Sequence, residues 1–351
     1  MNELKENNIY FSSEDNLDIR YGKLKTDMQD KIAQQIIDIF VRESEILELL
    51  PFDNAVSPTG GSTLVYGYIQ EKIPSTASFR AIGSEYTNSE AVLQQLAVTL
   101  KVFGGSFKVD RVIKSIESQL ESVNHQVQSK VRSAVSLFHD AMINGDSAVN
   151  SLSFDGLNKM LVGTKTEYGA DTYIDLSTMA KLKENADVFY EALLKLINST
   201  NATAIMVNGD MKTKIQTVAR ILSYKTESEE SFGRVVTTIG ENKVRIIDLK
   251  NKYSVSGETV TETPIVGIGS RDFGSGENKT TVTGLTDIYS AKFDGYDGFL
   301  GVTVTGDKVI DSYLPDFSQA GAVKTGEVEM IGAVALKNSR NAGVLRNIKI
   351  I

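Results

Sequence analysis

Hydrophobic residues between Val109 and Met142 follow a single helical stripe. They recur at steps of three and four, at Val109, Val112, Ile113, Ile116, Leu120, Val123, Val127, Val131, Ala134, Phe138 and Met142. That spacing defines one face of an α-helix, and Gly145 follows as a candidate C-cap. At about 1.5 Å per residue, a helix over Val109–Asn144 would be roughly 54 Å long. The pattern predicts one long helix with a narrow buried face, which leaves its other faces free for further contacts.

Two strands are predicted before this helix, at Leu64–Ile69 and Leu96–Phe103. The second alternates, which places one set of residues on one face, namely Leu96, Val98, Leu100 and Val102, and another set on the opposite face, namely Thr99 and Lys101. Residues Gln70–Gln95 between them are polar and lack helical period. Such a long connection is unusual inside a compact domain, and an isolated two-stranded ribbon is marginal in water. We expect a projecting ribbon that lies on another surface; a hairpin with a loop over its own core is the alternative.

The N-terminal region divides into two parts. Residues 1–25 are polar and are expected to form an arm that only neighbours order. Asp27–Leu50 is predicted to be a helix that Pro51 ends. Its apolar stripe consists of Ile32, Ile36, Ile37, Phe40, Val41, Leu47 and Leu50.

Shorter elements follow a linker-like stretch at residues 157–174. The expected elements are a helix capped by Ser177 and running to about Asn198, a buried strand Thr203–Val207, a turn Asn208–Asp210, a helix Met211–Tyr224, a hairpin of Arg234–Ile239 and Lys243–Leu249, strands Ile288–Phe293 and Leu300–Val304, and a long return strand Ala322–Leu336. This order predicts an α+β protein in which an α/β domain is inserted between the long helix and the return strand.

Seven short motifs, taken in order, resemble the major capsid proteins of tailed bacteriophages. They are Ala77–Gly83 (Ala-Ser-Phe-Arg-Ala-Ile-Gly), Thr99–Gly105, Val109–Arg111, Ile143–Asp146, Phe154–Leu157, Thr286–Phe293 and Asp297–Val302. Together they cover about residues 60 to 350, and their order makes the resemblance specific. The family shares the HK-ninety-seven-type fold, which encapsulin nanocompartments also use.

The resemblance implies an α+β fold of four parts. These are an N-terminal arm and helix at residues 1–59, an extended loop at 60–103, a peripheral domain with a long spine helix at 104–159 plus 321–351, and an inserted axial domain at 160–320. In the family the extended loop overlies the peripheral domain of a neighbouring subunit. The expected inter-subunit contact residues are therefore Tyr66, Tyr68, Lys72, Phe79 and Arg80.

The implied function is that of a major capsid protein without catalytic activity. It would self-assemble as pentamers and hexamers into the icosahedral head shell of a tailed phage, enclosing double-stranded DNA without sequence-specific binding. It would assemble in the host cytoplasm and reside in the virion, with a separate scaffolding protein and a portal as partners. An encapsulin-like compartment is one alternative, and a soluble two-domain α/β enzyme, supported by strand–helix alternation in residues 175–250, is another.

Some members of the family also join subunits through an isopeptide bond between a loop Lys and an Asn of a neighbour's peripheral domain. Here the corresponding candidates are Lys72 in the loop and Asn338 and Asn341 near the C-terminus. The residues around them do not match the motif of crosslinking members, so non-covalent assembly is expected.

Composition and charge narrow the chemistry. The chain has 351 residues, 41% of them hydrophobic, with a net charge of −8 and no Cys, which excludes thiolate metal sites and fits a reducing compartment. No apolar run reaches membrane-spanning length. The chain has no Lys/Arg-rich tail of the kind that grips phosphate. If the protein encloses DNA, as the resemblance implies, it does so as a wall and not as a neutralising binder; the alternative is an inner-wall patch formed by Lys337, Arg340, Arg346 and Lys349.

Catalytic, cofactor and metal motifs are lacking in the sequence. No P-loop occurs, and Gly267–Gly276 is expected to be a loop without phosphate affinity. Asp294–Gly298 lacks the remaining carboxylates of a calcium loop, so it is expected to be a tight turn. His125 and His139 lie fourteen residues apart on the long helix, roughly 21 Å along its axis, and are expected on the helix surface rather than at one metal.

Overall fold

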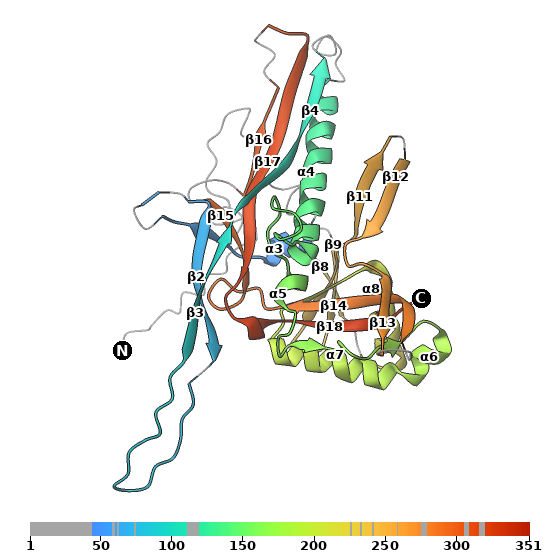
Figure 1. Ribbon diagram of the computed structural model, residues 1–351. Coiled ribbons are helices and arrows are strands. Elements are labelled where there is room, and N and C mark those ends of the chain that lie inside the picture. Colours follow the sequence, from blue (N-terminus) through green and yellow to red (C-terminus); the bar gives the residue numbers. More distant parts are fainter. Residues whose placement is uncertain are drawn as a thin grey trace, which may run out of the picture.

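The computed structural model (Figure 1) consists of two sheets, one long helix and two projecting ribbons. It describes residues 44–351 except 58–59, 62, 74, 111–118, 225–226, 232–233, 241, 258, 275–278, 305–308 and 316–319. The predicted N-terminal arm and most of the predicted first helix lie outside this part of the chain.

The first sheet has five strands. They are β1 (Phe52–Ala55), β4 (Lys101–Asp110), β15 (Phe299–Val304), β16 (Ile310–Tyr313) and β17 (Val323–Leu336). The order β1-β15-β17-β16 forms one path, and β4 pairs with β17 over ten positions, from Val323 opposite Asp110 to Gly332 opposite Lys101. The predicted long return strand is thereby confirmed.

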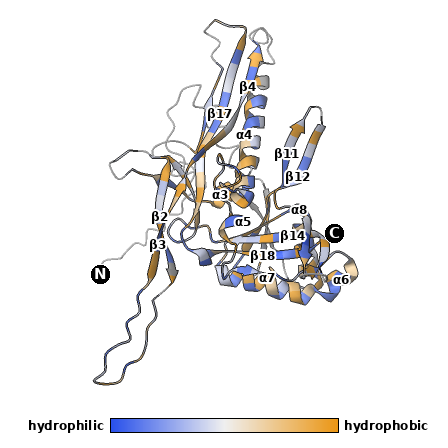
Figure 2. Cartoon of the chain, viewed as in Figure 1, coloured by the Kyte–Doolittle hydropathy of each residue, from blue (hydrophilic) through white to orange (hydrophobic). Residues whose placement is uncertain are grey.

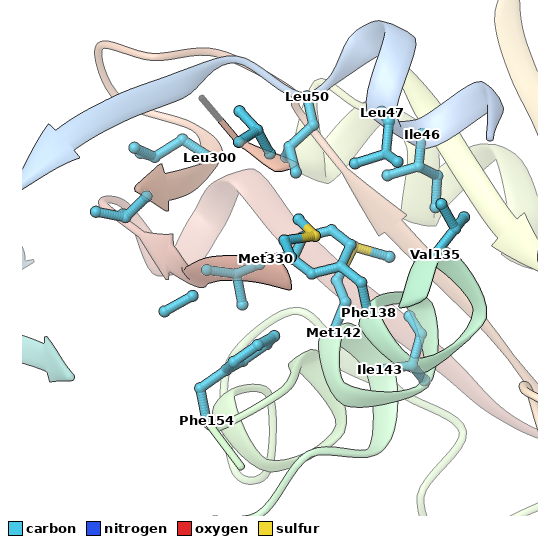
Figure 3. Close-up of a cluster of buried hydrophobic side chains, with 14 of the residues drawn as sticks. Ile46, Leu47, Leu50, Val135, Phe138, Met142, Ile143, Phe154, Leu300 and Met330 are labelled. Atoms are coloured by element: carbon cyan, nitrogen blue, oxygen red, sulfur yellow. The ribbon is translucent and has the colours of Figure 1, made fainter. Parts of the chain in front are cut away.

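Helix α4 (Gln119–Asn144) packs along β4 and β17. Its predicted stripe is confirmed, because Val127, Val131, Phe138 and Met142 are all at most 2% exposed. Phe138 lies in the centre of this core (Figure 3), with its ring centroid 6.0 Å from that of Phe103. Burying such side chains contributes about 1.5–3 kcal/mol each, so the stripe fixes the helix to the sheet.

The predicted start of this helix at Val109 is wrong. Val109 lies in β4, where it pairs with Lys324 of β17, and the strand ends only at Asp110. Residues 111–118 lie outside the described part, and α4 is described from Gln119. Alternating burial along β4 explains the difference, since Phe107 and Val109 face the core at a spacing of two as well as fitting a helical count.

The second sheet has nine strands. They are β5 (Glu167–Tyr168), β6 (Ile174–Asp175), β7 (Ala204–Val207), β8 (Glu227–Ser231), β9 (Arg234–Ile239), β10 (Val244–Asp248), β13 (Gly269–Phe273), β14 (Thr280–Ala291) and β18 (Ala342–Lys349). The main path is β5-β18-β14-β7-β10-β9-β8, while β13 pairs with β14 and β6 with β18. The predicted strand at Thr203–Val207 and the hairpin β9–β10 are confirmed.

Short helices accompany this second sheet. They are α5 (Leu157–Met160), α6 (Met179–Glu184), α7 (Ala186–Thr200), α8 (Gly209–Ile221) and the 3₁₀ helix η3 (Ser339–Asn341). Thr178, not Ser177, caps the first helix of the predicted 177–198 segment, and Asn185 separates α6 from α7. Asn208 is not part of a free turn, because its side chain accepts from the Met211 amide and caps α8.

Three further expectations are wrong. Ser44 has an extended backbone and caps the short helix α3 (Glu45–Leu49), so no continuous helix runs from Asp27 to Leu50. Residues 157–174 are not a linker, since Leu157 and Leu161 are fully buried and β5 and β6 extend the sheet. Gly267–Gly276 is not a plain loop, because β13 pairs with β14 there.

The prediction grouped residues 321–351 with the first sheet. In the structure, the chain passes between the two sheets more often than this grouping implies. Strand β17 lies in the first sheet, but β18 pairs with β14 in the second. Conversely, β15 and β16 come from the stretch 160–320 and pair with β17 in the first sheet. The chain therefore crosses between the sheets repeatedly, which ties them together.

Candidate functional site

The first projecting ribbon consists of β2 (Val65–Ile73) and β3 (Val92–Thr99), paired only with each other. Figure 1 shows the ribbon and its tip reaching far from both sheets. At its outer end, the Thr76 amide donates to Ser89 Oγ at 3.0 Å, and residues 75–91 form no helix or strand. The predicted projecting ribbon is confirmed, but β2 is longer than the predicted strand Leu64–Ile69, and the predicted strand Leu96–Phe103 is divided at Leu100 between β3 and β4.

The tip of the ribbon presents apolar side chains to solvent. Phe79 and Ile82 are 107% and 105% exposed, and Tyr86 is 65% exposed. The Arg80 guanidinium lies 5.2 Å from the centroid of the Tyr86 ring, and the Ser84 amide donates to the Ala81 carbonyl to close the turn. Exposed apolar groups held on an ordered tip are suited to insertion into another surface.

The base of the ribbon packs on its own chain. Tyr66 is 9% exposed, and its hydroxyl donates to Asp53 at 2.6 Å. Burial raises the pKa of Tyr66, and the hydrogen bond to Asp53 raises it further. Tyr68 stacks on Tyr66 with a centroid distance of 6.0 Å and is half-buried. Among the predicted contact residues whose side chains are described, Phe79 and Arg80 are thus exposed, while Tyr66 offers almost no surface.

The alternation of inward and outward side chains shifts by one residue at Leu100, between β3 and β4. In β3, Leu96 and Val98 point inward, and Leu100 itself is 3% exposed. In β4 the inward set becomes Phe103, Phe107 and Val109, so Val102 is 55% exposed and the prediction that it shares a face with Leu100 is wrong. The Leu100 amide donates to the Leu64 carbonyl at 2.8 Å, which pins the junction between the ribbon and the first sheet.

The candidate crosslinking residues occupy different settings. Lys72 lies in β2, and its side chain is outside the described part of the chain. Asn338 caps η3 by accepting from the Arg340 amide at 3.0 Å. Asn341 is 5% exposed and donates to the Asp297 carbonyl at 2.9 Å, so its amide nitrogen is already used inside the chain.

The two histidines of α4 differ from each other. His125 is exposed, as predicted. His139 is 7% exposed, so the prediction of a surface residue is wrong: its Nε2 lies 2.6 Å from Ser44 Oγ. Burial, together with the charge of Lys250, lowers the pKa of His139 to about 3. Although the pair has the spacing of a Ser–His catalytic couple, the Ser44 hydroxyl also accepts from the Leu47 amide, which gives it a capping role.

The basic stretch near the C-terminus does not form a free patch. Arg346 is ion-paired with Glu167 and with Asp287 and also donates to Asn158 Oδ1 at 2.8 Å. Its side chain is only 12% exposed. Lys337 donates to the Gly295 carbonyl at 2.8 Å. The charge that Arg346 would bring to the alternative inner-wall patch is therefore already balanced within the chain by Glu167 and Asp287.

The same network joins parts of the chain that are distant in sequence. Arg271 holds Asp287 through two hydrogen bonds of 2.6 Å, and the Asn347 amide donates to Asp287 Oδ1 at 3.0 Å. The contact between Arg346 and Asn158 links β18 to α5, which follows the C-terminal end of α4. Asp287 is 4% exposed, and its charge is therefore balanced within the protein rather than by solvent.

The described residues do not gather the side chains that a metal site needs. No group of three or more His, Cys, Asp or Glu side chains there could hold a metal ion. The predicted turn at Asp294–Gly298 is confirmed, with Asp294 and Asp297 paired to Lys292. Within this part of the chain no helix is both long and apolar enough to cross a bilayer.

Comparisons with known proteins agree at the level of fold. No family model and no curated protein matches the sequence. Among solved structures, the chain is similar to that of the holo-SrpI encapsulin complex from Synechococcus elongatus PCC 7942, with a TM-score of 0.54 and 12% identity over 87% of each chain. It is also similar to the capsid of a native GTA particle, with a TM-score of 0.50 and 9% identity over 89% of this chain and 90% of that chain. The capsid of the empty GTA particle gives the same TM-score.

Proposed function

We propose that this chain, which has the HK-ninety-seven-type fold, is a shell-forming subunit, and more specifically the major capsid protein of a tailed phage head. Many copies would tile a closed icosahedral surface as pentamers and hexamers around double-stranded DNA. A scaffolding protein and a portal would act during assembly in the host cytoplasm, and the finished shell would be part of the virion. The subunit itself would have no catalytic activity.

The observation that carries this proposal is the ordered but uncovered tip of the β2–β3 ribbon. Phe79 and Ile82 have no cover from their own chain, and exposed apolar groups that gather in one place mark an interaction site. A ribbon that reaches beyond its own core can bury them only on another molecule. Heterologous contacts of this kind close into rings, which then pack into a shell.

Non-covalent contacts are proposed to hold the shell together. Asn341 is buried and donates its amide hydrogen to Asp297 within its own chain. An isopeptide bond would join the Lys nitrogen to the side-chain carbonyl carbon of Asn341 and release this amide nitrogen as ammonia, so the contact with Asp297 would have to break. Denaturing electrophoresis of assembled shells tests this point: a single band near 38.3 kDa is expected, and a ladder of multiples would contradict it.

A variant of the tip tests the shell function. Replacing Phe79 and Ile82 together by Ser should leave the melting temperature of the subunit unchanged, because neither side chain packs on its own core. It should nevertheless abolish megadalton particles in light scattering and closed shells in negative-stain micrographs. The matched control is Thr87→Ser on the same exposed tip, which should assemble normally. Shells from the double variant at wild-type yield would refute the proposed role of the tip.

An encapsulin-like compartment is the second candidate, since the likeness to the SrpI encapsulin chain has a TM-score of 0.54. The contents of purified shells separate the two functions. Nuclease-protected DNA of genome length supports the phage head, whereas a packaged protein without DNA supports the compartment. Purified protein that forms no particle under any condition and shows a thermal shift with a small molecule would favour the soluble enzyme instead.

A further inference from the structure

The first ribbon carries apolar side chains on both of its faces, so hydrophobic burial alone does not determine how it is oriented. On the outward face, Val65, Ile69 and Leu93 are 48%, 63% and 61% exposed. On the inward face, Tyr66 is buried and Leu96 is half-buried. Figure 2 shows hydrophobic positions along β2 and β3. Since either face offers apolar surface, other contacts must decide which face turns toward the first sheet.

The inward face carries three polar groups that reach the rest of the chain. The Tyr66 hydroxyl donates to Asp53 Oδ2 at 2.6 Å, and Gln70 Nε2 donates to the Leu336 carbonyl at 3.0 Å. Burial raises the pKa of Tyr68, while a hydrogen bond with the Leu336 backbone lowers it in part. Tyr66, Tyr68 and Gln70 alternate along β2, so they form one inward row that faces the end of β17.

Asp53 is a shared acceptor at the base of this inward row. Its Oδ2 accepts from Tyr66 and also lies 3.5 Å from Lys337 Nζ, which is 5.9 Å from the centroid of the Tyr66 ring. Lys337 in turn donates to the Gly295 carbonyl at 2.8 Å. Asp53 itself lies in β1, which pairs with β15. This one carboxylate therefore joins the ribbon to β1 and, through Lys337, to the end of β17 and the turn before β15.

Beyond the inward row, the ribbon stands free of the described chain. Every described side chain from Glu71 to Gln95 is exposed. At about 3.3 Å per extended residue, the chain from Gln70 to Gly83 reaches up to about 43 Å. A rotation of about 10° at the base would then move the tip by about 7 Å, which exceeds the distance of about 4.5 Å within which apolar side chains touch. The position of the apolar tip therefore depends on the contacts at the base.

The second projecting ribbon depends less on its base. In the described part of the chain, β11 (Asn251–Ser256) and β12 (Thr259–Pro264) pair with each other. Their base is fixed to α4, because Ser136 Oγ donates to the Asn251 carbonyl at 3.3 Å. Strands of this length extend about 20 Å, so the same rotation would move the far end about half as far. Control of direction matters most for the first ribbon.

We propose that Asp53, together with the inward row, sets the direction in which the first ribbon leaves the subunit, and thereby the place at which its tip can meet a neighbouring copy. Asp53 is a positioning residue, because it acts through Tyr66 and Lys337 rather than at the tip. The link to a neighbouring copy rests on the proposed function. The direction of the ribbon is a property of the single subunit and can be measured there.

Distances between two spin labels test this direction in the full chain, which contains no Cys. Labels at Thr87→Cys on the tip and Val149→Cys on the loop after α4, both at exposed positions, are measured by double electron–electron resonance. An excess of unlabelled protein restricts the signal to distances within one chain. Asp53→Ala should shift or widen the distance distribution by about 7 Å, as a rotation of about 10° would. Gln70→Ala, which removes the hydrogen bond to Leu336, should act in the same way.

Two matched controls should retain the wild-type distribution. Gln95→Ala lies on the outward face of the same ribbon, and Asp272→Ala removes an exposed, ion-paired carboxylate of the second sheet. Circular dichroism shows whether each variant is folded, and Gln70→Ala decides the question if Asp53→Ala is not. Wild-type distributions in the folded variants at Asp53 and Gln70, or a wild-type distribution as wide as theirs, would overturn the proposal.

Negative-stain micrographs test the consequence for assembly. Particles of Asp53→Ala should vary in diameter, because their tips no longer leave the subunit in one direction, whereas Gln95→Ala should give wild-type particles. Uniform particles of wild-type diameter from Asp53→Ala would overturn its role in directing the contact. An absence of particles from the wild-type protein would instead refute the shell function, and the spin-label distances would still decide whether Asp53 sets the direction of the ribbon.

Discussion

His139 shows how a single side chain couples the long helix to the start of the described chain. Its folded-state pKa is about 3 because burial disfavours the charged imidazolium, against an ordinary value of 6.5. Between these pH values the unfolded chain binds the additional proton, so acid favours unfolding. The stabilisation is complete above pH 6.5 and is lost as the pH falls toward 3.

We therefore expect the free energy of unfolding to depend on pH through this residue. Between pH 6.5 and 4 the wild-type value should fall by up to about 1.4 kcal/mol per pH unit more steeply than that of His139→Gln. Urea titrations at several pH values measure the two slopes. His125→Gln, at the exposed histidine, should keep the wild-type slope; parallel curves for wild type and His139→Gln would contradict the assignment.

We expect Arg346 to contribute to the free energy of unfolding rather than to DNA binding. Removing one partner of a buried ion pair leaves the other charge unbalanced, which costs about 3–5 kcal/mol. Arg346→Gln should lose about that much stability in urea unfolding, since Glu167 and Asp287 remain behind. Arg340→Gln, at an exposed position, should lose less than about 0.5 kcal/mol. Similar stabilities for the two variants would show that the network around Arg346 is dispensable.

At the scale of the element, α4 depends on the buried face that Val127 marks. A charge placed there has no partner, and burying it costs several kcal/mol. Val127→Asp should lower the melting temperature of the subunit strongly, whereas Gln126→Asp, on the exposed side of the same turn, should change it little. Thermal unfolding followed by circular dichroism compares the two, and equal melting temperatures would mean that the stripe is assigned to the wrong face.

The two ribbons are elements of a different kind, because pairing alone cannot stabilise them. Each is anchored at its base by contacts with the first sheet or with α4, as the hydrogen bonds of Tyr66 to Asp53 and of Ser136 to Asn251 illustrate. Their free ends carry apolar groups that the described chain leaves open. Stability therefore resides in the sheets, and the ribbons are available for contacts.

At the scale of the whole molecule, charge governs the relation to DNA. The chain carries a net charge of −8. In the basic C-terminal stretch, Arg346 forms ion pairs with Glu167 and Asp287, so its charge is neutralised within the protein. Counterion release can then contribute little to affinity. We expect dispersed subunits to bind duplex DNA negligibly at physiological salt in a mobility-shift titration. Tight binding with a steep salt dependence would contradict this expectation.

Local pattern determined much of this protein. The stripe of α4, the β9–β10 hairpin, the buried strand β7 and the long strand β17 were all predictable, because each repeats its own period over enough residues. The ordered motifs predicted the HK-ninety-seven-type fold, and the structure confirms it. Phe79 and Arg80 could be placed on a projecting ribbon for the same reason: the polar stretch around them has no partner nearby in sequence.

Tertiary structure decided what local periodicity leaves ambiguous. Val109 fits a helical count and a strand count equally well, and pairing with Lys324, more than two hundred positions away, made it a strand residue. His139 lies against Ser44, the N-cap residue of α3, which is 95 positions away, and Arg346 is neutralised because β5, β14 and α5 converge on it. These outcomes depend on contacts between distant segments, whose energies no single window of sequence contains.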